Sequence, residues 1–390
     1  MPRAILEPIR PLVVATMNAT VIFDPDLIRK YDKAGPRYTS YPTAVQFHTG
    51  FGETEYRELA LASNATGRPL SLYVHIPFCD TVCFYCACNK IITKNRRHTL
   101  PYLDHLHREI ALQGALFDRS RPVEQLHWGG GTPTFISSTE MRKLMRMTGE
   151  HFRLLGDDSG EYSIEVDPRE TDDHTIALLR ELGFNRLSLG VQDFEPAVQK
   201  AVNRIQPREI TLQVMEAARR EGFKSISVDL IYGLPGQSVA SFDRTVNELI
   251  AQDPDRVSVF NYAHLPDLFK TQRQIDASAL PPPAVKLDIL RTVIERLTAA
   301  GYVYIGMDHF ELALAQRAGT LYRNFQGYST HADCDLIGLG ATSIGMVGDS
   351  YSQNLKGLEE YYGRIDENRL AVFRGVRLDA DDRLRRAVIT

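Results

Sequence analysis

Short apolar runs alternate with longer segments of helical periodicity along most of the 390 residues, and this alternation constrains the fold more than any other feature. Apolar runs bounded by Gly or Pro predict strands at 71–76, 124–128, 162–166, 186–191, 225–231, 256–262 and 302–307. Helical spacing predicts helices near 99–117, 138–153, 173–182, 207–221, 239–252 and 284–300. Six strand–helix repeats indicate a parallel sheet with right-handed crossovers. We therefore expect an α/β fold, either open or curled into a partial barrel.

Charge and hydropathy call for neither nucleic acid nor a membrane. The 45 Lys and Arg residues against 49 Asp and Glu give a net charge of −4, without a long run of one sign. The most apolar stretch near the start, residues 11–23, contains Asn18 and is too short to span a bilayer. We therefore expect a cytoplasmic protein, with residues 1–16 as an extension upstream of the fold.

Four of the five cysteines lie in "CDTVCFYCAC", residues 79–88, directly after the first predicted strand. So many thiols in one loop of a large chain indicate a metal rather than disulfides. Zinc would need a second group of ligands, for which the chain offers only Cys334 and nearby His331. An iron–sulfur cluster takes thiolates, either four with Cys88 or three with one iron left open for a small ligand. An open coordination position would indicate catalysis rather than a structural role.

The spacing Cys79-x3-Cys83-x2-Cys86 is the signature of radical S-adenosylmethionine enzymes, and the resemblance extends far beyond this loop. From about residue 24 onward the chain resembles the oxygen-independent coproporphyrinogen III oxidases, also called dehydrogenases. The segments that carry the resemblance include "GPRYTSYPT" (35–43), "YVHIPFC" (73–79), "HWGGGTPT" (127–134), "SIEVDPRE" (163–170), "GFNRLSLGVQDF" (183–194), "VDLIYGLPGQ" (228–237), "SVFNYAHLP" (258–266), "GMDHF" (306–310) and "RNFQGY" (323–328).

The resemblance implies a partial (β/α)6 barrel of the radical S-adenosylmethionine type. Residues 1–50 would form an N-terminal extension and arm, 51–345 the barrel with its cluster loop at 79–88, and 346–390 a truncated C-terminal extension. The family's C-terminal helical domain would be largely absent, and the loop after Phe310 is shorter than expected. On these grounds we expect cleavage of S-adenosylmethionine that is poorly coupled to product formation.

The resemblance also assigns the cofactor sites. Cys79, Cys83 and Cys86 would hold a [4Fe–4S] cluster, and two molecules of S-adenosyl-L-methionine would bind. The first would contact Tyr73, Gly130, Gly131, Thr132, Glu165 and Ile344. The second would contact Tyr85, Gly131, Thr132, Gln192, Arg204, Asp229 and Ala263. Tyr85 replaces an expected Phe but keeps an aromatic ring.

The implied reaction is the oxidative decarboxylation of coproporphyrinogen III to protoporphyrinogen IX in heme biosynthesis, using a 5′-deoxyadenosyl radical. The implied partners are the substrate and an electron donor such as a flavodoxin or ferredoxin, and the protein would be a monomer. The alternative is a radical-enzyme-like chaperone that binds and delivers heme. A zinc-stabilised structural protein is the third hypothesis.

Overall fold

The computed structural model describes residues 23–31, 40–306, 308–312, 322–324, 327–329 and 333–389. The chain divides into two compact units, Met1–Asp32 and Lys33–Thr390. In the first unit, α1 (Pro25–Tyr31) begins after Asp24, whose carboxylate accepts hydrogen bonds from two backbone N–H groups of the first turn. The predicted extension at 1–16 and residues 36–39 of "PRYTSYP" lie outside the described residues.

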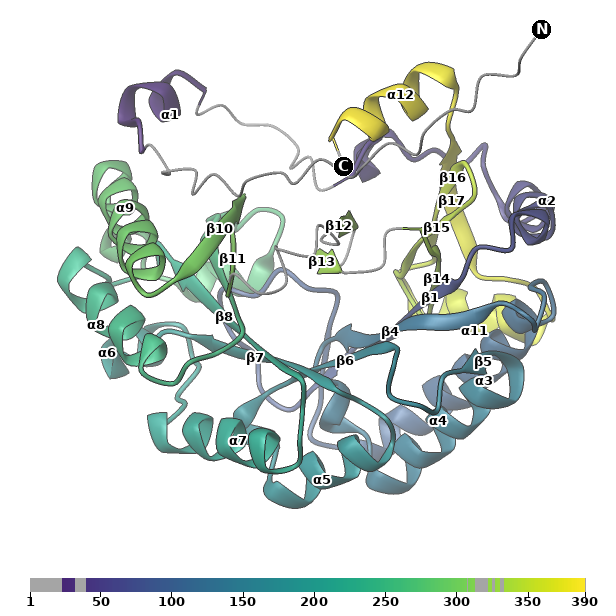
Figure 1. Ribbon diagram of the computed structural model, residues 1–390, viewed down its shortest axis with the longest axis horizontal. Helices are drawn as coiled ribbons and strands as arrows, with labels where there is room; N and C mark the ends of the chain where they lie inside the picture. Colours follow the sequence, from purple (N-terminus) through teal and green to yellow (C-terminus); the bar gives the residue numbers. More distant parts are fainter. Residues whose placement is uncertain are drawn as a thin grey trace, which may run out of the picture. The chain divides into compact units, whose positions relative to one another are not determined.

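Six neighbouring parallel strands form the centre of the second unit. They are β1 (Leu70–Ile76), β4 (Pro122–Gly130), β6 (Glu161–Val166), β7 (Arg186–Gln192), β8 (Ser225–Tyr232) and β9 (Arg256–Asn261). The helices that follow them are α3 (Thr99–Gly114), α4 (Ser138–His151), α5 (Asp173–Glu181), α7 (Arg208–Arg220), α8 (Val239–Ile250) and α9 (Pro283–Ala299). Figure 1 shows these helices along the convex side of the curved sheet. The predicted α/β class is confirmed, and each of the predicted strands and helices is present.

One edge of the sheet differs from the prediction of parallel strands throughout. The predicted strand at 302–307 is β10 (Tyr302–Gly306), but it does not pair with β9. Between them lies β11 (His309–Leu312), which is antiparallel to both neighbours. Only two residues separate β10 from β11, and so short a connection can join antiparallel strands but not parallel ones.

The other edge was not predicted. There β14 (Asp335–Leu339) runs parallel to β1, and β15 (Ile344–Val347), β16 (Ser350–Asn354) and β17 (Val372–Arg377) follow as antiparallel neighbours. The predicted domain boundary at residues 345 and 346 falls inside β15, where the sheet continues without a break.

The remaining elements are short strands and covering helices. They are β2 (Phe78–Cys79), β3 (Ile91–Ile92), β5 (Arg153–Leu154), β12 (Tyr322–Asn324), β13 (Gly327–Ser329), α2 (Glu53–Ser63), α6 (Pro196–Ala201), α11 (Leu358–Asp366) and α12 (Ala380–Ile389). Among the described helices, none is long and apolar enough to cross a membrane.

Candidate cofactor and cluster site

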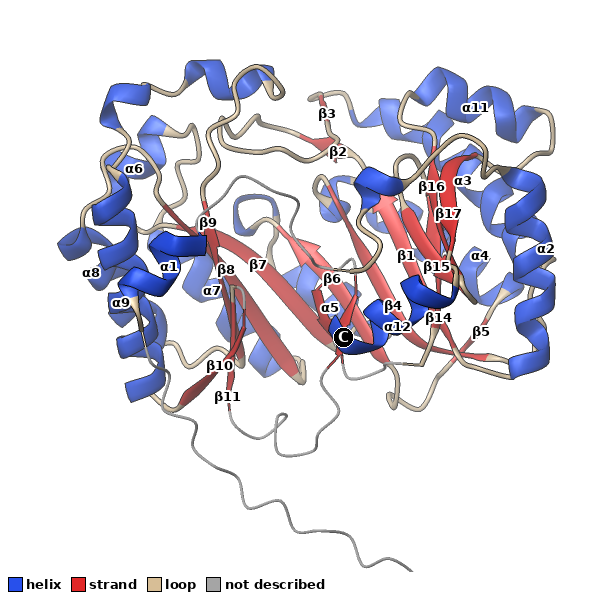
Figure 2. Cartoon of the chain, turned by 90° about the horizontal axis from the view of Figure 1, so that it is seen from above, coloured by secondary structure: helices blue, strands red, loops and turns tan. Residues whose placement is uncertain are grey.

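A cavity of about 280 Å³ lies at the carboxyl ends of the parallel strands, where ligands of such sheets bind. Figure 2 shows β1 and β4 pointing toward this edge, with β2 and β3 beyond it. Eleven of the residues proposed from the sequence line the cavity: Cys79, Cys83, Tyr85, Cys86, Gly130, Gly131, Thr132, Glu165, Gln192, Arg204 and Asp229. The other three, Tyr73, Ala263 and Ile344, are not part of its lining.

All three predicted cysteine ligands of the cluster loop line this cavity. Cys79 ends β2, Cys83 is buried, and Cys86 is partly buried. The backbone holds the loop in place, since Phe84 N–H donates to Val202 O at 3.0 Å. Within the described ranges, no three His, Cys, Asp or Glu side chains are grouped as they would be around a single metal ion. Three thiols from one short loop that line the same cavity are the ligand type that a [4Fe–4S] cluster takes.

Two guanidinium groups contact the sulfur of Cys83. Arg204 Nη1 lies 3.5 Å and Arg169 Nη2 lies 3.6 Å from Cys83 Sγ. Asp167 Oδ2 accepts hydrogen bonds from both, at 3.1 and 2.6 Å, so the buried positive charge is partly balanced. Hydrogen bonds from charged donors stabilise a thiolate ligand and influence the potential of a bound cluster. Sequence reasoning named Arg204 but missed Arg169, although "DPRE" places it two residues after a strand-ending Asp.

The protonation of the other two thiols differs because their surroundings differ. Burial raises the pKa of the Cys79 thiol to about 11, although Thr132 Oγ1 lies 3.6 Å from its sulfur. A hydrogen bond from the Cys88 thiol, helped by the Lys90 ammonium, lowers the pKa of Cys86 to about 6. Binding of iron requires thiolates, so cluster assembly would release a proton from Cys79.

The glycines at the end of β4 permit close packing around the cavity. Gly130 has a φ of 115°, and a Cβ there would meet the His75 ring at 2.6 Å. A Cβ at Gly131 would lie 2.7 Å from the Phe78 carbonyl oxygen, in the backbone just before the cluster loop. Gly131 N–H donates to Ile76 O at 2.9 Å. These glycines therefore let β4 lie directly against the segment that carries Cys79.

Glu165 is held by groups that were not predicted. Its Oε1 lies 3.1 Å from His127 Nε2, and its Oε2 accepts from Gly130 N–H at 3.2 Å. Although burial opposes ionisation, the interaction with His127 is strong enough to lower the pKa of Glu165. The His127 ring stacks on Tyr73 with centroids 5.7 Å apart, and Tyr73 Oη lies 3.0 Å from His75 Nδ1. Tyr73 thus supports the Glu165 side of the cavity from behind.

Asp229 supplies a second carboxyl group to the same cavity. It is partly buried, and desolvation, with the nearby Glu165 charge, raises the pKa of Asp229 to about 6. Ser188 Oγ lies 3.4 Å from Asp229 Oδ2. Gln192 has a left-handed backbone with φ of 70°, and its buried Oε1 has no hydrogen-bond partner among the described residues. A left-handed non-glycine residue with an unsatisfied amide is a feature of ligand sites.

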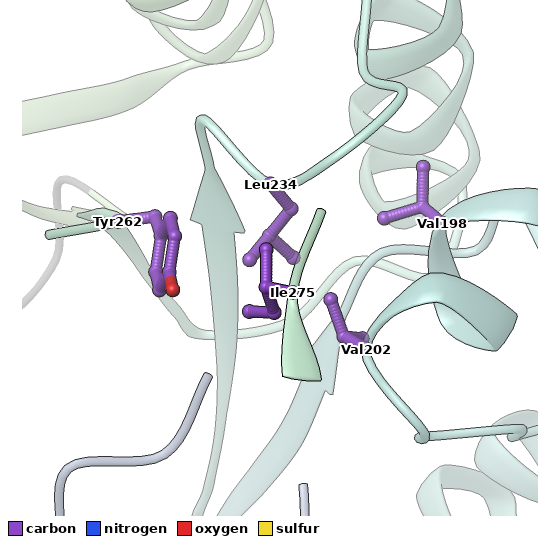
Figure 3. Close-up of a cluster of buried hydrophobic side chains, with 5 residues drawn as sticks. All are labelled: Val198, Val202, Leu234, Tyr262 and Ile275. Atoms are coloured by element: carbon purple, nitrogen blue, oxygen red, sulfur yellow. The ribbon is translucent and has the colours of Figure 1, made fainter. Parts of the chain in front are cut away.

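Tyr85 and Ala263 are joined by a residue that the sequence did not reveal. The buried Gln272 amide donates to Tyr85 O at 3.1 Å and to Ala263 O at 3.2 Å. Tyr85 also packs against the apolar cluster of Val198, Val202, Leu234, Tyr262 and Ile275, whose side chains Figure 3 shows converging from several elements. Gln272 therefore fixes the cluster loop to the segment after β9.

A buried carboxyl group behind β1 holds the turn that leads into Ile344. Glu109 of α3 accepts hydrogen bonds from Gly340 N–H at 2.6 Å, Tyr361 Oη at 2.7 Å and Asn354 Nδ2 at 2.6 Å. Burial raises the pKa of Glu109 to about 7. On the same helix, Tyr102 Oη donates to His75 O at 2.6 Å. α3 thus anchors both the end of β1 and the turn before β15.

Comparisons with known proteins agree with this geometry. The model of the radical SAM superfamily matches residues 73–249. An oxygen-independent coproporphyrinogen III oxidase of Pseudomonas aeruginosa is 57% identical over 378 residues, covering 96% of this chain and 82% of that protein. The Escherichia coli protein of the same name is 50% identical over 372 residues, covering 94% and 80%. A solved structure described as coproporphyrinogen III oxidase from Escherichia coli, a radical SAM enzyme, aligns with a TM-score of 0.89 at 48% identity and covers 94% of this chain and 83% of its own.

Proposed function

Because the chain belongs to the family of oxygen-independent coproporphyrinogen III oxidases, we propose that it decarboxylates coproporphyrinogen III with two molecules of S-adenosylmethionine bound in one cavity. As a radical SAM enzyme it uses a [4Fe–4S] cluster and S-adenosylmethionine. When bound, these supply a one-electron route to the removal of a hydrogen atom from an unactivated carbon. The similarity to named oxidases favours this function over heme delivery.

The residues of the cluster loop suit the cluster. Cys79, Cys83 and Cys86 would be its protein ligands, which leaves one iron for S-adenosylmethionine. Arg204 and Arg169 would donate to the Cys83 thiolate, and Asp167 would keep both guanidinium groups oriented. Cys88 is exposed, and its proposed role is to donate a hydrogen bond to Cys86 rather than to bind iron.

The observation that carries the proposal of two cofactor molecules is the pair of carboxyl groups, Glu165 and Asp229, that line one cavity. A second cavity of about 210 Å³, here called the inner cavity, shares these two residues. It is lined by residues of β4, β6, β7, β8, β9, β10 and β11. Arginines line it too, but Arg256 pairs with Glu311 at 2.9 Å, and Arg186 pairs similarly with Glu161 at 3.4 Å. In the inner cavity, Glu165 and Asp229 remain after these two pairs are counted, so the surplus charge of its lining is negative. A negative surplus favours cationic ligands.

S-adenosylmethionine carries a sulfonium and an ammonium group that match this charge. We assign the first molecule to the Glu165 side, near Gly130 and Thr132. We assign the second to the Asp229 side, where the free Gln192 Oε1 can accept a hydrogen bond and the Arg204 guanidinium can bind a carboxylate. A second cation beside Asp229 would also remove the electrostatic cost of two neighbouring carboxylates.

The need for electron-transfer partners follows from the reaction. Each propionate loses one hydrogen atom, CO₂ and one further electron to become a vinyl group, so the enzyme needs both an electron donor and a final acceptor. We propose a flavodoxin- or ferredoxin-like donor, a monomeric protein and a cytoplasmic location, where reduced cysteines and an iron–sulfur cluster persist.

Equilibrium binding of labelled S-adenosylmethionine to the anaerobically reconstituted protein tests the two-molecule proposal. We expect two sites in the wild-type protein and one in Asp229→Ala, with cluster content unchanged. Ser227→Ala, which alters a neighbouring residue of the inner cavity, is the matched control and should keep two sites. A single site in the wild-type protein would refute the proposal.

A further inference from the structure

The segment after the cluster loop is attached directly to the first cluster ligand. β3 pairs with β2 in parallel, with Ile92 opposite Cys79, and Thr93 N–H donates to Cys79 O at 3.0 Å. Figure 2 shows β2 and β3 side by side beyond the carboxyl ends of the strands. Residues 90–98, here called the basic segment, therefore form the surface next to the cluster loop.

The basic segment carries a charge opposite to that of the whole chain. Between residues 79 and 98 there are four Lys or Arg residues and one acid, Asp80, whereas the net charge of the chain is −4. Lys94, Arg96 and Arg97 are exposed. Ile92, directly opposite Cys79, is 42% exposed. A local surplus of positive charge with an exposed apolar side chain is typical of a surface that binds an acidic protein.

One arginine fixes the basic segment while two cationic groups remain available. The Arg96 guanidinium lies 4.5 Å from the centre of the Phe135 ring and 3.3 Å from Glu170 Oε2. By contrast, the Lys94 and Arg97 side chains make no hydrogen bond or ion pair with any described residue. Arg96 thus holds the segment in place, while the exposed Lys94 and Arg97 side chains can form ion pairs with a partner.

We propose that the basic segment is the docking surface for a small acidic protein that delivers single electrons to the cluster. This inference rests on the cluster ligands assigned above. The reaction consumes electrons one at a time, so a reduced carrier must reach the cluster, bind briefly and leave. Electron-transfer complexes have small, weak interfaces, for which charge complementarity increases the association rate more than the affinity. Lys94 and Arg97 would provide this attraction beside the strand that holds Cys79.

Charge reversal tests the proposal in the reconstituted protein. Stopped-flow bleaching of the cluster by a reduced, acidic flavodoxin measures the second-order rate constant of electron delivery. In Lys94→Glu/Arg97→Glu we expect this constant to fall about tenfold or more at low ionic strength. Raising the salt concentration should slow the wild-type reaction but not that of the variant. Lys94→Gln/Arg97→Gln removes half as much charge and should give an intermediate rate.

Two controls separate docking from other effects. Arg68→Glu/Arg119→Glu makes the same change in charge beyond the amino ends of β1 and β4, and β1 alone is about 20 Å long. It should leave the flavodoxin rate near the wild-type value. Chemical reduction by dithionite, followed by turnover, should proceed equally in all variants, so a failure of the proposed enzyme activity would be recognised separately.

Three results would overturn the inference. The first is an unchanged flavodoxin rate in Lys94→Glu/Arg97→Glu. The second is an equal loss in Arg68→Glu/Arg119→Glu, which would indicate only a long-range effect of net charge. The third is an unchanged flavodoxin rate together with a raised KM for coproporphyrinogen III, because the basic segment would then bind the carboxylates of the substrate.

Discussion

Replacing Glu109 by Gln tests whether this buried carboxyl group titrates behind the cofactor cavity. Its folded-state pKa of about 7 lies above the ordinary value of 4.5 because the side chain is buried. The folded protein therefore retains a proton that the unfolded chain releases. The stabilising contribution is fully present below pH 4.5 and is lost as the pH rises through about 7. At about 1.36 kcal/mol for each pH unit, the loss amounts to about 3 kcal/mol.

Urea unfolding of both proteins between pH 5 and pH 8 measures this effect. The glutamine side chain in the variant cannot ionise, so the free energy of unfolding of Glu109→Gln, relative to wild type, should increase across this range by up to about 3 kcal/mol. Other titrating groups, including Asp229 and His107, are present in both proteins and cancel in the difference. Equal pH dependence in the two proteins would show that Glu109 does not change its protonation state, and would refute the reasoning.

Three further changes test the candidate site. Replacing any one of the three proposed cluster ligands by Ser should abolish the cluster, whereas Cys88→Ser should keep it. Iron and sulfide analysis measures the cluster content, and loss of the cluster in Cys88→Ser would show that Cys88 is a ligand. Because Arg204 contacts Cys83 and pairs with Asp167, Arg204→Ala should lower the iron content, since removing one member of a buried ion pair costs about 3–5 kcal/mol; full iron content would contradict this. Because desolvation raises the pKa of Asp229 to about 6, the affinity for the second S-adenosylmethionine should rise as the pH increases through 6, by roughly 1.5–3 kcal/mol in all. Binding of Asp229→Asn, measured between pH 5 and pH 8, should show no such rise. Parallel pH curves for the two proteins would argue against the assignment.

The parallel centre of the sheet was predictable because each strand combines a run of apolar residues with a following helical pattern. The family resemblance then assigned Glu165, Gln192 and Asp229 to the cofactor, and their places near strand ends agree with one site at that edge of the sheet. The antiparallel edge was not predictable in this way. β16 reads "SYSQN" and β17 reads "VFRGVR", and neither has the apolar run that identifies a buried parallel strand.

Residues that act through other residues were also missed. Glu109 and Gln272 are buried polar side chains whose partners are distant in the sequence, including Asn354 for Glu109 and Tyr85 for Gln272. A Glu within an amphipathic helix and a Gln in a loop carry no local signal of such contacts. Arg169 had a weak signal, since it follows the strand-ending Asp167, but its contact with Cys83 depends on how two loops meet.

Anaerobic turnover with coproporphyrinogen III, following CO₂ and 5′-deoxyadenosine together, tests the proposed reaction most directly. The shortened loop after Phe310 alone indicates poor coupling, but eleven of the assigned residues line one cavity. The proposal therefore predicts that both products appear in proportion, with two CO₂ released for each protoporphyrinogen IX formed. Activity should disappear when any of the three cluster cysteines is replaced. Release of 5′-deoxyadenosine without CO₂ from coproporphyrinogen III, or stoichiometric binding of heme without any product, would contradict it.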